Sequence, residues 1–143
     1  MLTNLLRCRA LQEDADSIPS YPPAVPISRA RFAGIVDDTI DELPDWVVDR
    51  IDNLFVVVED APTPEQDPEG EGILGIYEGI SLAERGVDYF GTTPDRIVIF
   101  YRPHLELDLD DAELTAEVRR TVLHEIAHHI GIDDDRLHEL GWD

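Results

Sequence analysis

A short run near the end of the sequence contains the side chains best suited to bind a metal ion. His124 and His128 are four residues apart, and Glu125 directly follows the first of them. In a helix this spacing puts both imidazoles on one face, one turn apart, where they can bind the same ion. A glutamate beside the first histidine can reach a water molecule at that ion and act as a general base. The pattern HExxH therefore predicts a zinc site that activates water.

The residues after this pattern offer two candidates for a third metal ligand. Gly131 stands where the helix is expected to end, because glycine readily takes the left-handed conformation that reverses the chain. Asp134 follows three residues later, and a carboxylate oxygen is an accepted zinc ligand. His138 is the alternative, and we favour Asp134 because the turn at Gly131 delivers it to the ion. With His124 and His128, Asp134 would leave one position of a tetrahedral zinc ion for water.

One amphipathic helix is expected to carry the whole HExxH pattern. Asp110 and Glu113 predict a capping box at its start. Apolar residues at helical spacing predict its buried stripe: Leu114, Val118, Val122, Ile126 and Ile130. His124 and His128 fall on the opposite side, so they do not look like core residues. His129 lies about 140° around the helix from His124 and is expected to be a supporting residue or a surface residue, not a ligand.

The upstream sequence predicts two helices followed by strands. Residues 28–43 show helical spacing of apolar residues behind a Ser28 N-cap, and Pro44 ends this helix. A second short helix is expected to bury four apolar residues: Val47, Val48, Ile51 and Leu54. Three strands are expected at residues 55–60, 73–80 and 96–102, with a loop over 61–72. This order favours an α+β fold, in which a short mixed sheet packs against helices that include the HExxH helix.

The first 27 residues are expected to form a flexible tail. Prolines at positions 19, 22, 23 and 26 exclude a helix or a central strand there. The folded domain is therefore predicted over residues 28–143, and a chain of this length can bury one core.

Composition limits the partners and the compartment. The net charge is −21, and all eleven basic residues are arginine. Nucleic-acid binding draws much of its affinity from clustered basic residues, so a nucleic-acid partner is not expected. Cys8 is the single cysteine, which excludes an internal disulfide and fits a reducing compartment. No apolar run approaches the roughly 18 residues that span a bilayer, so we expect a cytoplasmic protein without a membrane segment.

The string HEIAHHIGIDD, residues 124–134, resembles the HExxHxxGxxD motif of metzincin-like metallopeptidases of the snapalysin type. The wider segment from Ser28 to Trp142 resembles the minimal zincin family of small bacterial proteins, which have a compact mixed α/β fold. The resemblance implies that His124, His128 and Asp134 bind Zn²⁺. It also implies that Glu125 takes the proton from a water molecule that attacks a peptide bond. A peptide or protein substrate is then expected to add as a strand to a sheet edge, for which residues 74–80 are the candidate.

Two other functions fit parts of the same pattern. The histidines also resemble those of metal-dependent endoribonucleases that mature ribosomal RNA, but Asp134 stands where these enzymes have a final histidine. The acidic charge would also repel RNA. The second alternative is a non-catalytic zinc-binding or interaction module, in which His138 or Glu139 completes a closed set of four ligands.

Overall fold

The computed structural model describes residues 5–6, 27–81, 84–86 and 94–142 of the 143-residue chain. The predicted tail lies outside these residues, apart from Ile27 and a two-residue strand at Leu5–Leu6. The domain boundary at residue 27 therefore stays a prediction. Within the described residues, no helix is both long and apolar enough to cross a membrane.

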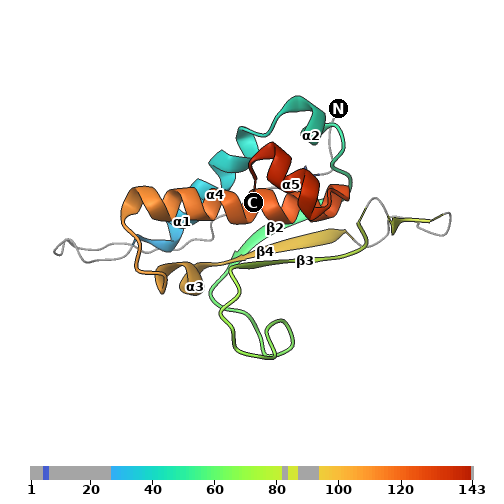
Figure 1. Cartoon of the computed structure of the whole chain (residues 1–143). Helices are drawn as coiled ribbons and strands as arrows, with labels where there is room; N and C mark the ends of the chain where they lie inside the picture. Colours follow the sequence, from blue (N-terminus) through green and yellow to red (C-terminus); the bar gives the residue numbers. More distant parts are fainter. Residues whose placement is uncertain (1–4, 7–26, 82–83, 87–93, 143) are drawn as a thin grey trace.

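The helices and strands form an α+β fold. They are β1 (Leu5–Leu6), α1 (Arg29–Asp41), α2 (Asp45–Val48), β2 (Leu54–Glu59), β3 (Gly75–Glu78), β4 (Asp95–Phe100), α3 (Tyr101–Leu105), α4 (Asp111–Ile130) and α5 (Asp134–Leu140). The sheet has the order β1-β2-β4-β3, with β2 parallel to β1 and β4, and β3 antiparallel to β4. The long helix α4 lies along the sheet, and it contacts α1, β3 and β4 (Figure 1). The predicted fold class, a short mixed sheet packed against the HExxH helix, is confirmed.

A single apolar cluster lies between α1, α4 and the sheet. Phe32 and Val36 of α1 are fully buried, as are Ile97 and Ile99 of β4. All five residues of the predicted α4 stripe belong to this cluster: Leu114, Val118, Val122, Ile126 and Ile130. Burial of this stripe fixes the rotation of α4, so its remaining face points away from the core.

Both predicted ends of α4 are confirmed. The Asp110 side chain accepts a hydrogen bond from the Glu113 backbone N–H at 2.8 Å, and the Glu113 side chain accepts one from the Asp110 N–H at 3.1 Å. At the other end, Gly131 has a φ of 81°, and the N–H of Ile132 donates to the carbonyl of Ala127. This left-handed turn leads the chain directly into α5.

Two predicted elements end earlier than expected. The strand predicted through Arg102 stops at Phe100, because α3 starts at Tyr101. Pro103 lies in the first turn of α3, where a missing N–H costs little. The predicted second helix is only the four-residue α2, and Leu54, expected on that helix, opens β2. The strand predicted over residues 73–80 narrows to β3, and the loop predicted over 61–72 contains no helix or strand.

The strand β3 and the helix α4 are in close contact at Gly75. A Cβ atom at this position would lie 2.8 Å from Thr121 Cγ2 and 3.1 Å from the carbonyl oxygen of Val98. We therefore expect Gly75→Ala to lower the free energy of unfolding by about 1–3 kcal/mol through overpacking. Urea denaturation of the two proteins measures this difference.

A compensating substitution tests the cause of this effect. Thr121→Ser removes Cγ2 and keeps the hydroxyl, so the double variant should recover part of the stability lost in Gly75→Ala. The contact with the Val98 carbonyl remains and limits the recovery. Additive effects of the two substitutions would show that the contact with Thr121 is not the cause.

Candidate metal centre

The structure brings His124, Glu125 and His128 together on α4. One possible ligand atom from each residue lies within 4.8 Å of the others. The two imidazole centroids are 4.5 Å apart, with 63° between the ring planes. Both histidines are half-buried, while Glu125 is only 7% exposed. The i, i+4 spacing therefore produces the convergence that the sequence predicts, on the face opposite the apolar stripe.

Glu125 and His128 interact directly. Glu125 Oε1 lies 3.2 Å from Nδ1 of His128. This hydrogen bond raises the pKa of His128 above its usual value, although burial opposes the shift, and the charge of Asp134 adds to it. A metal ion needs the neutral imidazole, so it competes with a proton that Glu125 and Asp134 both favour.

The two candidate third ligands lie on α5, outside the cluster of three. Asp134 is the first residue of α5, and Asp133 N-caps that helix by accepting from the Arg136 N–H at 2.9 Å. The charge of Asp134 acts on His128, so its carboxylate lies within electrostatic reach of the cluster. His138 lies in the last turn of α5 and is exposed. The choice of Asp134 over His138 stays a prediction.

The donor atoms suit a zinc ion. Zinc accepts imidazole nitrogen and carboxylate oxygen in tetrahedral sites, and His124 and His128 supply two imidazoles from one rigid helix. Asp134 would add the oxygen ligand without a change in this chemistry.

Comparison with known proteins identifies the family. Residues 51–142, which include β2 to β4 and the whole of α4 and α5, match the family described as zincin-like metallopeptidase. The chain belongs to this family. The fold of this zincin-like chain is also similar to that of a conserved hypothetical protein from T. thermophilus, with 27% identity and a TM-score of 0.50. The similarity covers 80% of this chain and 97% of the other, whereas a comparison with curated proteins gives no significant match.

His129 directly follows His128, but its side chain points into the protein. It is fully buried, so of the two predicted alternatives, a supporting residue or a surface residue, the surface residue is wrong. Its Nε2 accepts a hydrogen bond from the Asp52 N–H at 3.2 Å, and its Nδ1 lies 3.0 Å from Oδ2 of Asp95. An accepting Nε2 requires the proton to be on Nδ1, which donates to Asp95. Burial lowers the pKa of His129 and favours this neutral form.

Asp95 is the centre of a buried polar network that contacts α4 at His129. Its side chain is 3% exposed and accepts from the Tyr77 hydroxyl, from Nη2 of Arg85 at 2.8 Å and from Nδ1 of His129. Burial alone would raise the pKa of Asp95, but the bonds from Tyr77 and Arg85 outweigh it and hold the pKa below its usual value. Arg85 also binds Oδ2 of Asp52 at 3.0 Å. The network joins α4 to β3 and β4 through His129, one turn after Glu125.

A second buried histidine, His104 of α3, holds α4 near its middle. Its Nδ1 lies 2.7 Å from the carbonyl oxygen of Phe100, so Nδ1 carries the proton and donates. Nε2 lies 3.1 Å from Oγ1 of Thr121, one turn before Glu125, and in the neutral ring it competes with the Glu117 carbonyl, 3.0 Å from Oγ1, for the hydroxyl proton. Burial lowers the pKa of His104 below the usual 6.5. This contact was not predicted, because the predicted strand included Tyr101 and Arg102, the first two residues of α3, and no helix was expected at His104.

The buried His104 predicts a loss of stability in acid. Below about pH 6.5 the unfolded chain binds a proton at His104, whereas the folded chain keeps this imidazole neutral. The free energy of unfolding therefore decreases as the pH is lowered through that range. His104→Asn keeps a donor for the Phe100 carbonyl and removes the titration. We expect a shallower stability slope between pH 7 and 5, by up to about 1.4 kcal/mol per pH unit.

Urea unfolding at several pH values, with a chelator present throughout, measures this slope. The chelator removes the contribution of metal at His124 and His128. Parallel pH profiles for the wild type and His104→Asn would show that a lowered pKa of His104 does not cause the loss of stability in acid.

Proposed function

We propose that this zincin-like chain is a zinc-dependent peptidase, with His124, His128 and Asp134 as zinc ligands and Glu125 as the general base. The observation that carries the proposal is the convergence of His124, Glu125 and His128 within 4.8 Å on one face of α4. Membership of the family supports it, because the HExxH string lies within the matched residues.

The residues divide the chemistry between them. A bound zinc ion would polarise a peptide carbonyl and make a water molecule more acidic. His124 and His128 serve as neutral ligands, and Asp134 offsets part of the positive charge. Glu125 is nearly buried beside His128, where its carboxylate takes the proton from the attacking water and returns it to the leaving amine.

The free edge of β3 is the proposed site for the substrate backbone. β3 is the last strand of the sheet and pairs only with β4 among the described residues. The Phe100 N–H donates to the Leu74 carbonyl at 2.9 Å, so the alternation of an antiparallel ladder leaves the N–H and C=O of Gly75 and Tyr77 pointing away from β4. Gly75 packs against Thr121, three residues before His124, so this edge runs beside the metal-binding face. An extended peptide can therefore pair with β3 within reach of Glu125.

Zinc stoichiometry and hydrolysis of a quenched fluorescent peptide library together test the function. We expect one zinc ion per chain after purification without chelator, and hydrolysis that a chelator stops and added zinc restores. His128→Ala should lose the zinc. If zinc binds but no peptide in the library is cleaved, the non-catalytic zinc module is the better description.

Two matched variants on α5 distinguish the third ligand. Asp134→Ala should weaken zinc binding by at least about tenfold, because it removes a charged oxygen ligand. Asp135→Ala removes the neighbouring exposed carboxylate and should leave zinc affinity unchanged. Loss of affinity in His138→Ala, and not in Asp134→Ala, would assign the third position to His138.

A further inference from the structure

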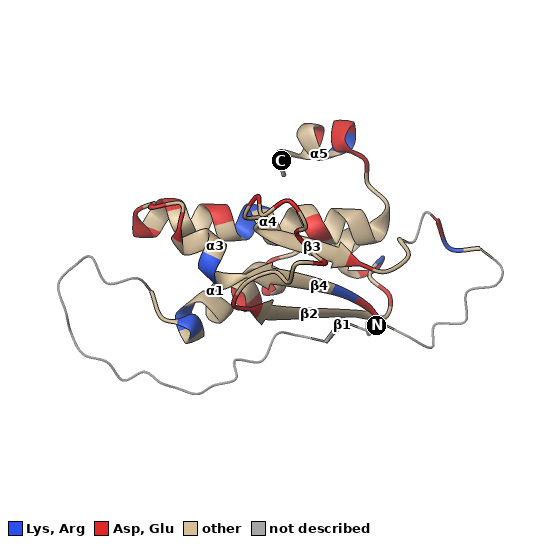
Figure 2. Cartoon of the chain, turned by 90° about the horizontal axis from the view of Figure 1, so that it is seen from below, with Lys and Arg blue, Asp and Glu red and all other residues tan. Residues whose placement is uncertain are grey.

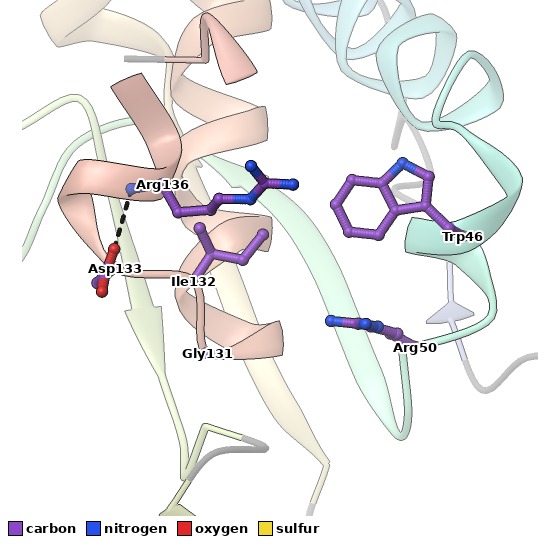
Figure 3. Close-up of a pocket in the computed structure, with 6 residues that line it drawn as sticks. All are labelled: Trp46, Arg50, Gly131, Ile132, Asp133 and Arg136. Carbon is purple, nitrogen blue, oxygen red and sulfur yellow. Dashed lines mark hydrogen bonds between the residues drawn. The ribbon is translucent and has the colours of Figure 1, made fainter. Parts of the chain in front are cut away.

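A pocket lies between α2 and the turn that joins α4 to α5. Its volume is about 630 Å³, within the range of small-molecule sites. Six residues line it: Trp46, Arg50, Gly131, Ile132, Asp133 and Arg136 (Figure 3). His124, Glu125 and His128 are not among them, so the pocket is separate from the proposed catalytic cluster.

Arg50 supplies a positive charge to this pocket and forms no ion pair with an acidic side chain within the described part of the chain. The other eight described arginines each form an ion pair with Asp or Glu. Arg50 forms none with a described residue, and its guanidinium lies 5.5 Å from the centroid of the Trp46 ring. The sequence has 32 acidic residues and 11 basic ones, and the acidic residues recur along the helices and loops of the described chain (Figure 2). An arginine without an acidic partner is therefore unexpected in this chain.

Arg136 extends into the same pocket from the opposite wall. Figure 3 shows its guanidinium and the Trp46 indole pointing toward one another, with Arg50 beside the indole. Nη1 of Arg136 donates to Glu139 at 2.9 Å, which leaves its other N–H groups for a ligand. The Asp133 carboxylate accepts a hydrogen bond from the Arg136 backbone N–H as the N-cap of α5, and it forms no ion pair with Arg50 or Arg136. The pocket thus presents two guanidinium groups beside an aromatic ring and the apolar Ile132.

We propose that this pocket binds the carboxylate of a small ligand or peptide end with an aromatic or apolar body. Arg50 and Arg136 bind the carboxylate, since a planar guanidinium matches its two oxygens. The body packs on Trp46 and Ile132. A carboxylate replaces the acidic partner that Arg50 lacks.

N-acetylphenylalanine is a suitable probe, because it carries one carboxylate and one aromatic ring. Its amide, N-acetylphenylalanine amide, has the same body without the charge. Isothermal calorimetry should detect saturable binding of the acid, and at least about tenfold weaker binding of the amide, which lacks the charge-assisted hydrogen bonds. Trp46 lines the pocket, and the other tryptophan of the chain, Trp142, stacks on it with ring centroids 6.2 Å apart, so tryptophan fluorescence should change with the same binding curve.

Arg50→Gln and Arg136→Gln should each weaken binding of the acid by about tenfold. Arg102→Gln is the matched control, because it removes an exposed arginine that is ion-paired with Asp60, away from the pocket, and it should leave binding unchanged. His128→Ala should also leave binding unchanged, so failure of the proposed peptidase function would not affect this result.

Three outcomes would overturn the proposal. Equal binding of the acid and the amide would mean that the pocket recognises only the aromatic body. Absence of binding at millimolar concentration would mean that it does not recognise this class of ligand. Binding of phenyl phosphate without binding of N-acetylphenylalanine would assign the two arginines to a phosphate instead of a carboxylate.

Discussion

Glu125→Gln is expected to reduce peptide hydrolysis by about 10²–10⁴-fold and to leave zinc bound. The amide has nearly the shape of the carboxylate but cannot take a proton from water at neutral pH. Because Glu125 is not one of the three proposed ligands, the metal should remain. Elemental analysis of the purified variant gives the zinc content, and initial rates on a cleaved library peptide give the activity.

The control for this variant is Glu117→Gln, which changes another glutamate on the same helix. Glu117 forms an exposed ion pair with Arg120, two turns before Glu125, and is not expected to reach the substrate bond. Its activity should therefore equal that of the wild type. Equal activity of Glu125→Gln and the wild type would rule out the role of Glu125 as the base, and loss of zinc in that variant would make it a ligand.

The helix α4, which carries His124, Glu125 and His128, could be predicted because the sequence features that define it are local. The capping box at Asp110 and Glu113, the apolar stripe and the turn at Gly131 each depend on residues within a few positions of one another. They fix where α4 begins, where it ends and which face it buries. With these settled, the spacing of His124 and His128 is enough to bring their rings together.

The buried network around Asp95 could not be predicted, because its residues are far apart in sequence. His129 pairs with Asp95, 34 positions away, and its backbone partner Asp52 is 77 positions away. Helical spacing was a local signal for its burial, because His129 lies three and seven residues after Ile126 and Val122 of the apolar stripe, but it does not identify the partners. A second signal was the aspartate that opens the buried strand Asp95–Phe100, since a buried carboxylate requires donors. α3 was missed for a different reason, since Tyr101 favours a strand until the pairing ends at Phe100.

Asp95→Asn is expected to lower the free energy of unfolding by about 3–5 kcal/mol, the largest expected effect on stability. The substitution removes the charge that balances the guanidinium of Arg85, which is only 9% exposed. The amide keeps one oxygen for Tyr77 and His129, but its NH2 group then faces the Ile80 N–H, which donates to Oδ1 of Asp95. Because a typical domain is stable by only about 5–15 kcal/mol, urea unfolding should show the transition shifted to much lower denaturant.

Asp52→Asn provides the matched control for this prediction. It removes the other carboxylate bound to Arg85, but Asp52 is about half exposed, so the expected loss is below about 1 kcal/mol. If Asp95→Asn does not fold, Tyr77→Phe tests the same network by removing one donor, with an expected loss of about 1–2 kcal/mol. Similar losses for the Asp95 and Asp52 variants would contradict a central role for Asp95. A much larger loss for Asp95→Asn would show that α4 is held at His129, one turn after Glu125, by a buried ionic network as well as by apolar packing.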